Sequence, residues 1–223
     1  MGYTAVRGPN LAISVTGETI YTNSPTKGFY KLVQPTDIST YGTIYKERYL
    51  GNRNKLPTLQ KGDIVFGAER NIGKCLIICN ELENAVTNYH GMSITTKDDK
   101  SLIEKIFIGL FILYLREKNY FEYYSVDGQG GSFGKEKTEN IIIPCFSNKI
   151  INILAKLYHN DKRFPNCNSI AEFQNVDELW TKKAGIFELN EMVSKLKIRL
   201  NLMLDCIVNN ESVIIDCNFE NSK

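Results

Sequence analysis

The sequence predicts a mixed α/β fold, in which a β-rich domain with a buried central helix precedes a long C-terminal helix. Residues 63–66 and 75–78 are short and densely apolar, which is typical of strands buried on both faces. A broad apolar face on residues 102–114 predicts the buried helix. A heptad pattern over residues 189–207 predicts the long helix.

The composition is that of an ordinary globular domain. Of 223 residues, 43% are hydrophobic and 23% are charged, which suffices for one substantial domain or one domain with an appendage. The 27 Lys and Arg residues against 25 Asp and Glu residues leave a net charge of +2, too small by itself to indicate a nucleic-acid partner. Evidence for such a partner must come from local clusters.

Membrane and metal sites are not expected. No charged-then-apolar leader opens the sequence, and its longest strongly apolar run, residues 106–115, falls short of the roughly 18 residues that span a bilayer. We therefore expect a cytoplasmic protein. The six cysteines form no CxxC pair and only two histidines could assist them, so we expect no metal. No glycine-rich cofactor loop follows a strand, so we also expect no cofactor. Cys75 and Cys79 lie in an apolar segment and are expected to be buried thiols.

The first part of the chain alternates between strand-forming and turn-forming residues. Residues 12–15 and 29–33 are predicted strands, with a loop at 23–28. The next stretch, residues 45–61, carries five basic residues against Glu47 alone, which predicts phosphate binding; a solvated loop with no partner is the alternative. The candidate phosphate contacts are Lys46, Arg48, Arg53 and Lys55.

Two glycine-rich loops superficially resemble phosphate-binding P-loops. In residues 67–74, five residues separate the glycines where that motif has four, and Cys75 stands where it needs Ser or Thr. In residues 128–135 the glycine spacing is also wrong, and Glu136 takes the hydroxyl position. Nucleotide binding is therefore excluded at both loops. Each is either a flexible turn or a place where the backbone approaches DNA closely.

Caps and periodicity predict the helices of the second half. Asp98 or Ser101 can cap the central helix, which is expected to run to about Lys118 with Leu110 on its apolar face. Residues 140–144 are a predicted short strand ended by proline, and Ser147 is a plausible cap for an amphipathic helix that continues to Leu157.

A connector and a terminal helix complete the chain. We expect one domain over residues 1–160, a polar connector over 161–182 anchored by Trp180, and a helical segment over 183–223, with the helix itself at about 187–208. A strict 3.5-residue period more often indicates a helix partner than packing on its own domain. The candidate oligomerisation seam is Leu189, Val193, Leu196, Leu200, Met203 and Ile207.

The order of these features resembles the target-recognition domain of type I restriction-modification specificity (S) subunits. The resemblance covers about residues 25–160, and the terminal helix stands where that family has its spacer helix. No single motif is decisive, but order and spacing together are fairly specific. The segments that carry it are 29–38, 41–44, 59–66, 72–74, 88–90, 128–134 and 141–144.

The resemblance implies a DNA reader without chemistry of its own. Each recognition domain of the family reads one half of a bipartite site in double-stranded DNA, and a separate adenine methyltransferase (modification) subunit and a restriction subunit act on the DNA. This chain shows one such unit, so it is either a half-size subunit that forms a homodimer through its coiled-coil seam or a recognition domain cut from a larger protein. Val6-Arg7-Gly8 supports the second alternative, since it resembles the opening of recognition domains in fused adenine-N6 DNA methyltransferases.

Under this interpretation, six loop residues are candidates for base-edge or near-base contacts: Arg70, Asn71, Lys74, Tyr89, His90 and Gln129. No catalytic residues are expected. The nearest approach to a nuclease cluster is Asp63 with Glu69 and Lys74, but Asp63 is expected to begin a buried strand. A function of another class also stays open, in which the heptad helix and aromatic loops bind a protein partner.

Overall fold

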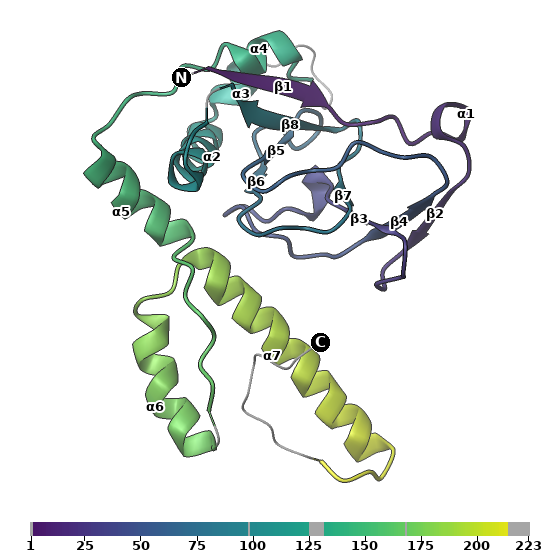
Figure 1. The fold of residues 1–223 in the computed structure, drawn as a ribbon, viewed down its shortest axis with the longest axis vertical. Helices are drawn as coiled ribbons and strands as arrows, with labels where there is room; N and C mark the ends of the chain where they lie inside the picture. The colour runs from purple at the N-terminus through teal and green to yellow at the C-terminus, as the bar shows by residue number, and fades with distance from the viewer. Residues whose placement is uncertain (1, 98, 125–131, 168, 214–223) are drawn as a thin grey trace. The chain divides into compact units, whose positions relative to one another are not determined.

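Short apolar segments pair into two four-stranded sheets in the computed structural model, which describes residues 2–97, 99–124, 132–167 and 169–213 (Figure 1). The first sheet is antiparallel throughout, and in the second only the β3–β7 pair is parallel. In spatial order the first sheet contains β1 (Tyr3–Arg7), β8 (Gly91–Thr96), β5 (Ile64–Gly67) and β6 (Cys75–Ile77). The second contains β2 (Thr19–Thr22), β4 (Tyr49–Asn52), β3 (Tyr30–Leu32) and β7 (Ala85–Val86).

Strands β5 and β6 are buried on both faces, which confirms the prediction from their dense apolar sequences. Because successive side chains of a strand point to opposite faces, Val65 and Phe66 enter different parts of the core. Val65 packs in a cluster with Val33 and Ile38. Phe66 packs edge-on against Phe121, at 5.5 Å between ring centroids. Cys75 and Cys79 are buried, as expected.

Helix α2 (Leu102–Glu117) is the predicted buried helix, and the chain has the predicted mixed α/β class. Ser101 caps it, because its hydroxyl accepts from the Glu104 N–H while the Glu104 carboxylate accepts from the Ser101 N–H. The buried face is rotated from the expected one: Leu110 is half-buried, whereas Ile112 is fully buried. The face is centred near Gly109, where an added Cβ would collide with Ile77 of β6.

Three segments differ from the sequence prediction. Residues 13–16 form the short helix α1 (Ile13–Thr16) instead of a strand, and Asn10 fixes the turn before it by accepting from the Ala12 N–H. Residues 141–144, predicted as part of a strand over 140–144, form no strand. The Ala5 N–H of neighbouring β1 instead donates to the Glu139 carboxylate. Residues 170–181 form helix α6, where an irregular connector was expected.

The remaining elements of the first half are short. They are the 3₁₀ turn η1 (Pro35–Asp37), α3 (Tyr120–Tyr124) and α4 (Lys135–Glu139). The chain divides into two compact units, residues 1–152 and 153–223, with the division inside helix α5 (Asn148–Tyr158). We had expected the first domain to end near residue 160. The apolar pattern of α5 predicts a core-facing side formed by Ile150, Ile153, Leu154 and Leu157. These residues are exposed, and Ile151, Ala155 and Tyr158 are buried instead.

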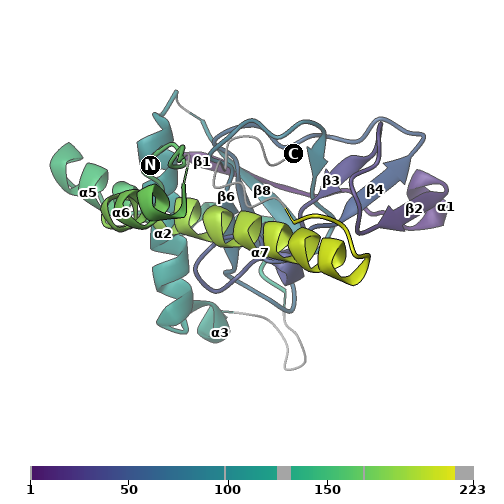
Figure 2. The same ribbon diagram turned by 90° about the horizontal axis from the view of Figure 1, so that it is seen from below.

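The second unit contains the end of α5, helix α6 (Ile170–Thr181) and helix α7 (Ile186–Val208). Helix α7 is continuous, and its bounds are close to the predicted 187–208 (Figure 2). Trp180 anchors the region as expected, since its indole N–H donates to the Arg163 carbonyl at 2.6 Å. Buried Glu188 organises the start of α7: its carboxylate contacts His159 and accepts the backbone N–H groups of Asn160, Asp161 and Gly185. In the described residues, no helix is both long and apolar enough to cross a bilayer.

Candidate functional site

Three loops meet at one edge of the first sheet because of strand register. Arg7, the last residue of β1, lies opposite Met92 of β8. Gly67, the last residue of β5, lies opposite Gly91, the first residue of β8. The end of β1, the loop after β5 and the turn before β8 must therefore lie side by side. We call this region the loop edge, defined as Arg7, residues 69–74 and residues 88–90.

Backbone hydrogen bonds hold these loops together. The Ala68 N–H donates to the His90 carbonyl at 2.9 Å, and the Gly8 N–H donates to the Gly91 carbonyl at 3.0 Å. A Cβ at Gly8 would collide with the Asn88 carbonyl, so glycine permits this close approach. Phe133, a described residue of the second glycine-rich segment, also approaches these loops, because its N–H donates to the Ala68 carbonyl at 2.8 Å.

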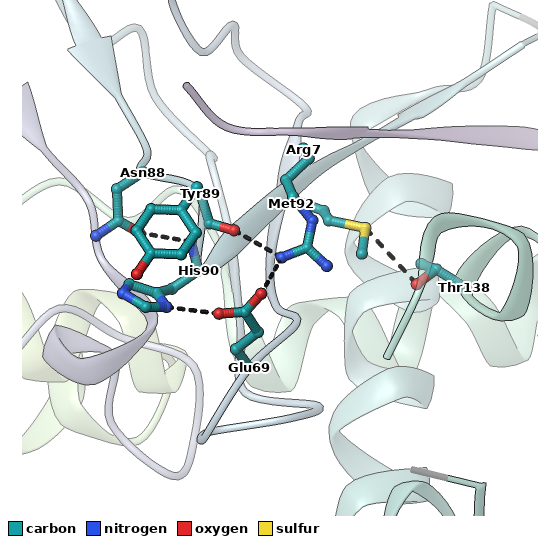
Figure 3. Close-up of polar contacts among 7 residues, drawn as sticks. All are labelled: Arg7, Glu69, Asn88, Tyr89, His90, Met92 and Thr138. Atoms are coloured by element: carbon teal, nitrogen blue, oxygen red, sulfur yellow. Dashed lines mark hydrogen bonds and ion pairs between the residues drawn. The ribbon is translucent and has the colours of Figure 1, made fainter. Parts of the chain in front are cut away.

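A charged network crosses the loop edge (Figure 3). Arg7 Nη1 donates to Glu69 Oε1 at 2.5 Å and to the Tyr89 carbonyl at 2.8 Å. His90 Nδ1 lies 2.8 Å from the other carboxylate oxygen, Glu69 Oε2. The Tyr89 and His90 rings lie 3.8 Å apart between centroids, and Tyr89 is 40% exposed. The edge thus presents a guanidinium, an imidazole and a phenol to the solvent.

The carboxylate determines which nitrogen of His90 carries the proton. Burial alone would raise the pKa of Glu69, but the hydrogen bonds from His90 and Arg7 outweigh it and hold that pKa below its usual value. An ionised carboxylate can only accept, so His90 Nδ1 must donate to it. In the neutral ring, Nε2 is then a hydrogen-bond acceptor.

The residues predicted to contact bases have different environments. Arg70 is exposed, and so is Tyr89; His90 is half-buried. Lys74 is directed inward, where its ammonium donates to the Ile38 carbonyl at 2.9 Å and burial lowers its pKa. Asn71 is half-buried and donates its N–H to the Glu69 carbonyl at 2.6 Å. Gln129 lies outside the described residues.

The candidate phosphate contacts do not form one cluster. Strand β4 lies within the basic stretch and places Lys46 and Arg48 before one of its ends and Arg53 and Lys55 after the other. Arg48 Nε donates to Asp37 Oδ2 at 2.7 Å, and this carboxylate is buried. Lys46, Arg53 and Lys55 are exposed.

Two residues of the network, Arg7 and Glu69, were not among the predicted DNA contacts. The sequence signal for Arg7 is an arginine at the end of an alternating segment followed by Gly-Pro, but nothing in the sequence links it to Glu69. Asp63 does not join Glu69, because its carboxylate accepts from Thr95 Oγ1 and the Gln60 N–H. Among the described residues, no three His, Cys, Asp or Glu side chains are grouped to hold a metal ion.

The chain is similar in structure to part of a solved protein. No family model matches the chain, and no curated protein matches it. The neighbour comes from a solved structure concerning complex assembly and conformational transition of the type I R-M system, with a TM-score of 0.45 and 12% sequence identity. The likeness covers 69% of this chain and 36% of the other, so this chain spans little more than a third of that neighbour's length.

Proposed function

We propose that this chain is the sequence-specific DNA-binding specificity component of a restriction-modification system. It reads one half of a bipartite target and directs a methyltransferase and a nuclease partner to it, without catalysing a reaction itself. The observation that supports this function is the loop edge, where strand register gathers three loops and orders their polar side chains. Base edges are read by such donors and acceptors, and side chains that are ordered before binding lose less entropy on contact.

The exposed cations of the basic stretch supply the non-specific part of the binding. Lys46 precedes β4, and Arg53 and Lys55 follow it, so they contact phosphates at two separate places. Arg48 instead bonds η1 to the start of β4, and Lys74 bonds the residue after η1 to the loop edge. This division assigns DNA affinity to Arg53 and Lys55 and sequence selection to Arg70, Tyr89 and His90.

Helix α7 supplies the second half-site in this proposal. Val193, Leu200 and Ile207 of the seam are 65%, 57% and 58% exposed, so this part of the seam is open to a partner helix, whereas Leu189 packs on the Trp180 and Met192 cluster. A second copy would place two recognition units about a two-fold axis, matching a bipartite site. The alternative within the same class is a recognition domain from a fused adenine-N6 methyltransferase.

The proposal is tested by selecting randomised duplexes with the full chain and its methyltransferase subunit, at two salt concentrations. We expect one motif to be enriched and retention to fall steeply with salt, because cations released from the phosphates favour binding at low salt. Arg53→Ala should weaken binding to every sequence alike, whereas Arg70→Ala should relax one position of the motif.

Failure to enrich any motif with the methyltransferase subunit present would overturn the proposal. The exposed seam of α7 also favours a second function, a protein-interaction module without DNA binding. Under that function the chain would associate through α7 but retain no duplex at either salt concentration. Mapping methylated adenines in the source genome, with and without this gene, separates the two functions in the cell.

A further inference from the structure

We propose that Arg7 reads a guanine in the major groove and that Glu69 is the positioning residue that holds its guanidinium for this contact. The inference rests on the function proposed above and identifies the kind of base recognised at one position of the target. It assigns a role to two residues that the sequence patterns alone did not mark as DNA contacts.

The hydrogen bonds of Arg7 leave one edge of its guanidinium available. Nη1 donates to Glu69 and to the Tyr89 carbonyl, which uses both of its hydrogens. Within the described part of the chain, Nε and Nη2 of Arg7 have no hydrogen-bond partner, and Figure 3 shows Arg7 bonded through one terminal nitrogen only. The available Nε–Nη2 edge has two parallel N–H donors.

The orientation of this edge is fixed by two different loops. Glu69 comes from the loop after β5, and the Tyr89 carbonyl comes from the turn before β8. Glu69 cannot follow Arg7 freely, since its second oxygen is bonded to His90. An ordinary surface ion pair adds little stability because two long side chains must be ordered. Here that ordering also prepares the guanidinium for a directional contact.

Two parallel donors match guanine better than any other base. In the major groove guanine presents two adjacent acceptors, N7 and O6. Adenine presents a donor in place of the second acceptor, cytosine presents a donor, and thymine presents one acceptor beside a methyl group. Arg7 therefore discriminates one G·C pair from the alternatives, whereas a phosphate contact would carry no sequence information.

The test compares motifs selected from randomised duplexes by the full chain with its methyltransferase subunit. The wild-type chain should select a guanine at one position, and Arg7→Ala should reduce that preference about tenfold or more while the other positions are unchanged. Arg7→Lys keeps the charge but lacks the rigid pair of parallel donors, so it should weaken the same preference. Arg53→Ala is the matched control and should alter no position of the motif.

Glu69 is tested at the same position. Glu69→Ala should reduce the same guanine preference, but in an Arg7→Ala background it should have no further effect at that position, because it acts on that position through Arg7. A wild-type chain that selects no motif would overturn the proposed function. A wild-type chain that selects a motif which Arg7→Ala and Arg7→Lys leave unchanged would overturn the guanine assignment alone.

Discussion

Arg70 is held in the left-handed backbone region, with φ of 58°. A non-glycine residue costs roughly 1 to 2 kcal/mol in this conformation. Since the Arg70 side chain is exposed, packing does not explain why an arginine occupies this position. Strain retained at an exposed loop residue indicates that the side chain itself has a role, and the DNA contact proposed above would supply one.

Arg70→Gly should therefore separate stability from function. We expect the unfolding free energy to stay within about 1 kcal/mol of the wild-type value, because relief of strain offsets the greater unfolded-state entropy of glycine. Sequence selectivity should fall. Urea denaturation and duplex selection measure the two effects. Asn84→Gly is the control, since Asn84 is exposed with φ of 51° but lies outside the loop edge; an equal loss of selectivity there would contradict the role of Arg70.

Glu69 should give the fold a measurable pH dependence. Hydrogen bonds from His90 and Arg7 hold the pKa of its carboxyl below the ordinary 4.5, even though burial opposes this. The ionised form therefore stabilises the folded state above about pH 4.5, and this contribution is lost as the pH falls through the folded-state pKa.

Glu69→Gln should accordingly lower the unfolding free energy at pH 7, and the difference from wild type should shrink toward pH 3. Urea denaturation at several pH values measures this. Glu18→Gln, which changes an exposed carboxylate, is the control and should have a smaller effect at pH 7. If Glu69→Gln lowered the unfolding free energy as much at pH 3 as at pH 7, the role of the ionised carboxylate would be contradicted.

At the scale of one element, α2 shows why an apolar pattern locates a helix better than it orients it. The pattern identified the helix correctly but predicted a face that included Leu110. Gly109 allows close approach to Ile77 of β6, and the Cys75 thiol lies 3.1 Å from the Gly109 carbonyl. Glycine adds nothing to an apolar pattern, so this contact was invisible in the sequence.

The rotated face predicts a difference between two neighbouring substitutions in α2. Ile112→Ala should cost about 2 to 5 kcal/mol of unfolding free energy, because Ile112 is fully buried and its loss leaves a cavity. Leu110→Ala should cost clearly less, since Leu110 is only half-buried. Chemical denaturation of both variants measures the difference. An equal or greater loss of unfolding free energy in Leu110→Ala would instead support the buried face that the sequence predicted.

At the scale of the whole molecule, helix α7 leads to a prediction about homodimer formation. Leu200 lies on the heptad seam and Ile198 lies off it, yet both are 57% exposed. Leu200→Glu should dissociate the proposed homodimer, whereas Ile198→Glu should leave it intact, because only the seam position faces a partner helix in a heptad. Light scattering measures the mass of each variant, and circular dichroism should show equal helix content. A wild-type monomer, or equal dissociation by both variants, would rule out a seam dimer.

Most helices and strands that have a clear local apolar pattern could be predicted from the sequence. The strands at 63–66 and 75–78 followed from their apolar runs, and α2 and α7 from their periodicity. Strand β4 was missed because charged and polar residues surround it, and only its pairing with β2 and β3 makes it a strand. Helix α6 was missed because half of its residues are polar. Its residue Phe173 packs on a cluster formed with Trp180 and Met192.

The sequence by itself determined the fold class, the buried strands, the central and terminal helices, and the loops that carry Arg70, Tyr89 and His90. Local periodicity and glycine placement contain that information. The tertiary structure alone decided that Arg7 meets Glu69, 62 residues further along the chain, and that Lys74 is directed inward. These contacts depend on the register between strands, and register results from the packing of the whole sheet rather than from any one segment.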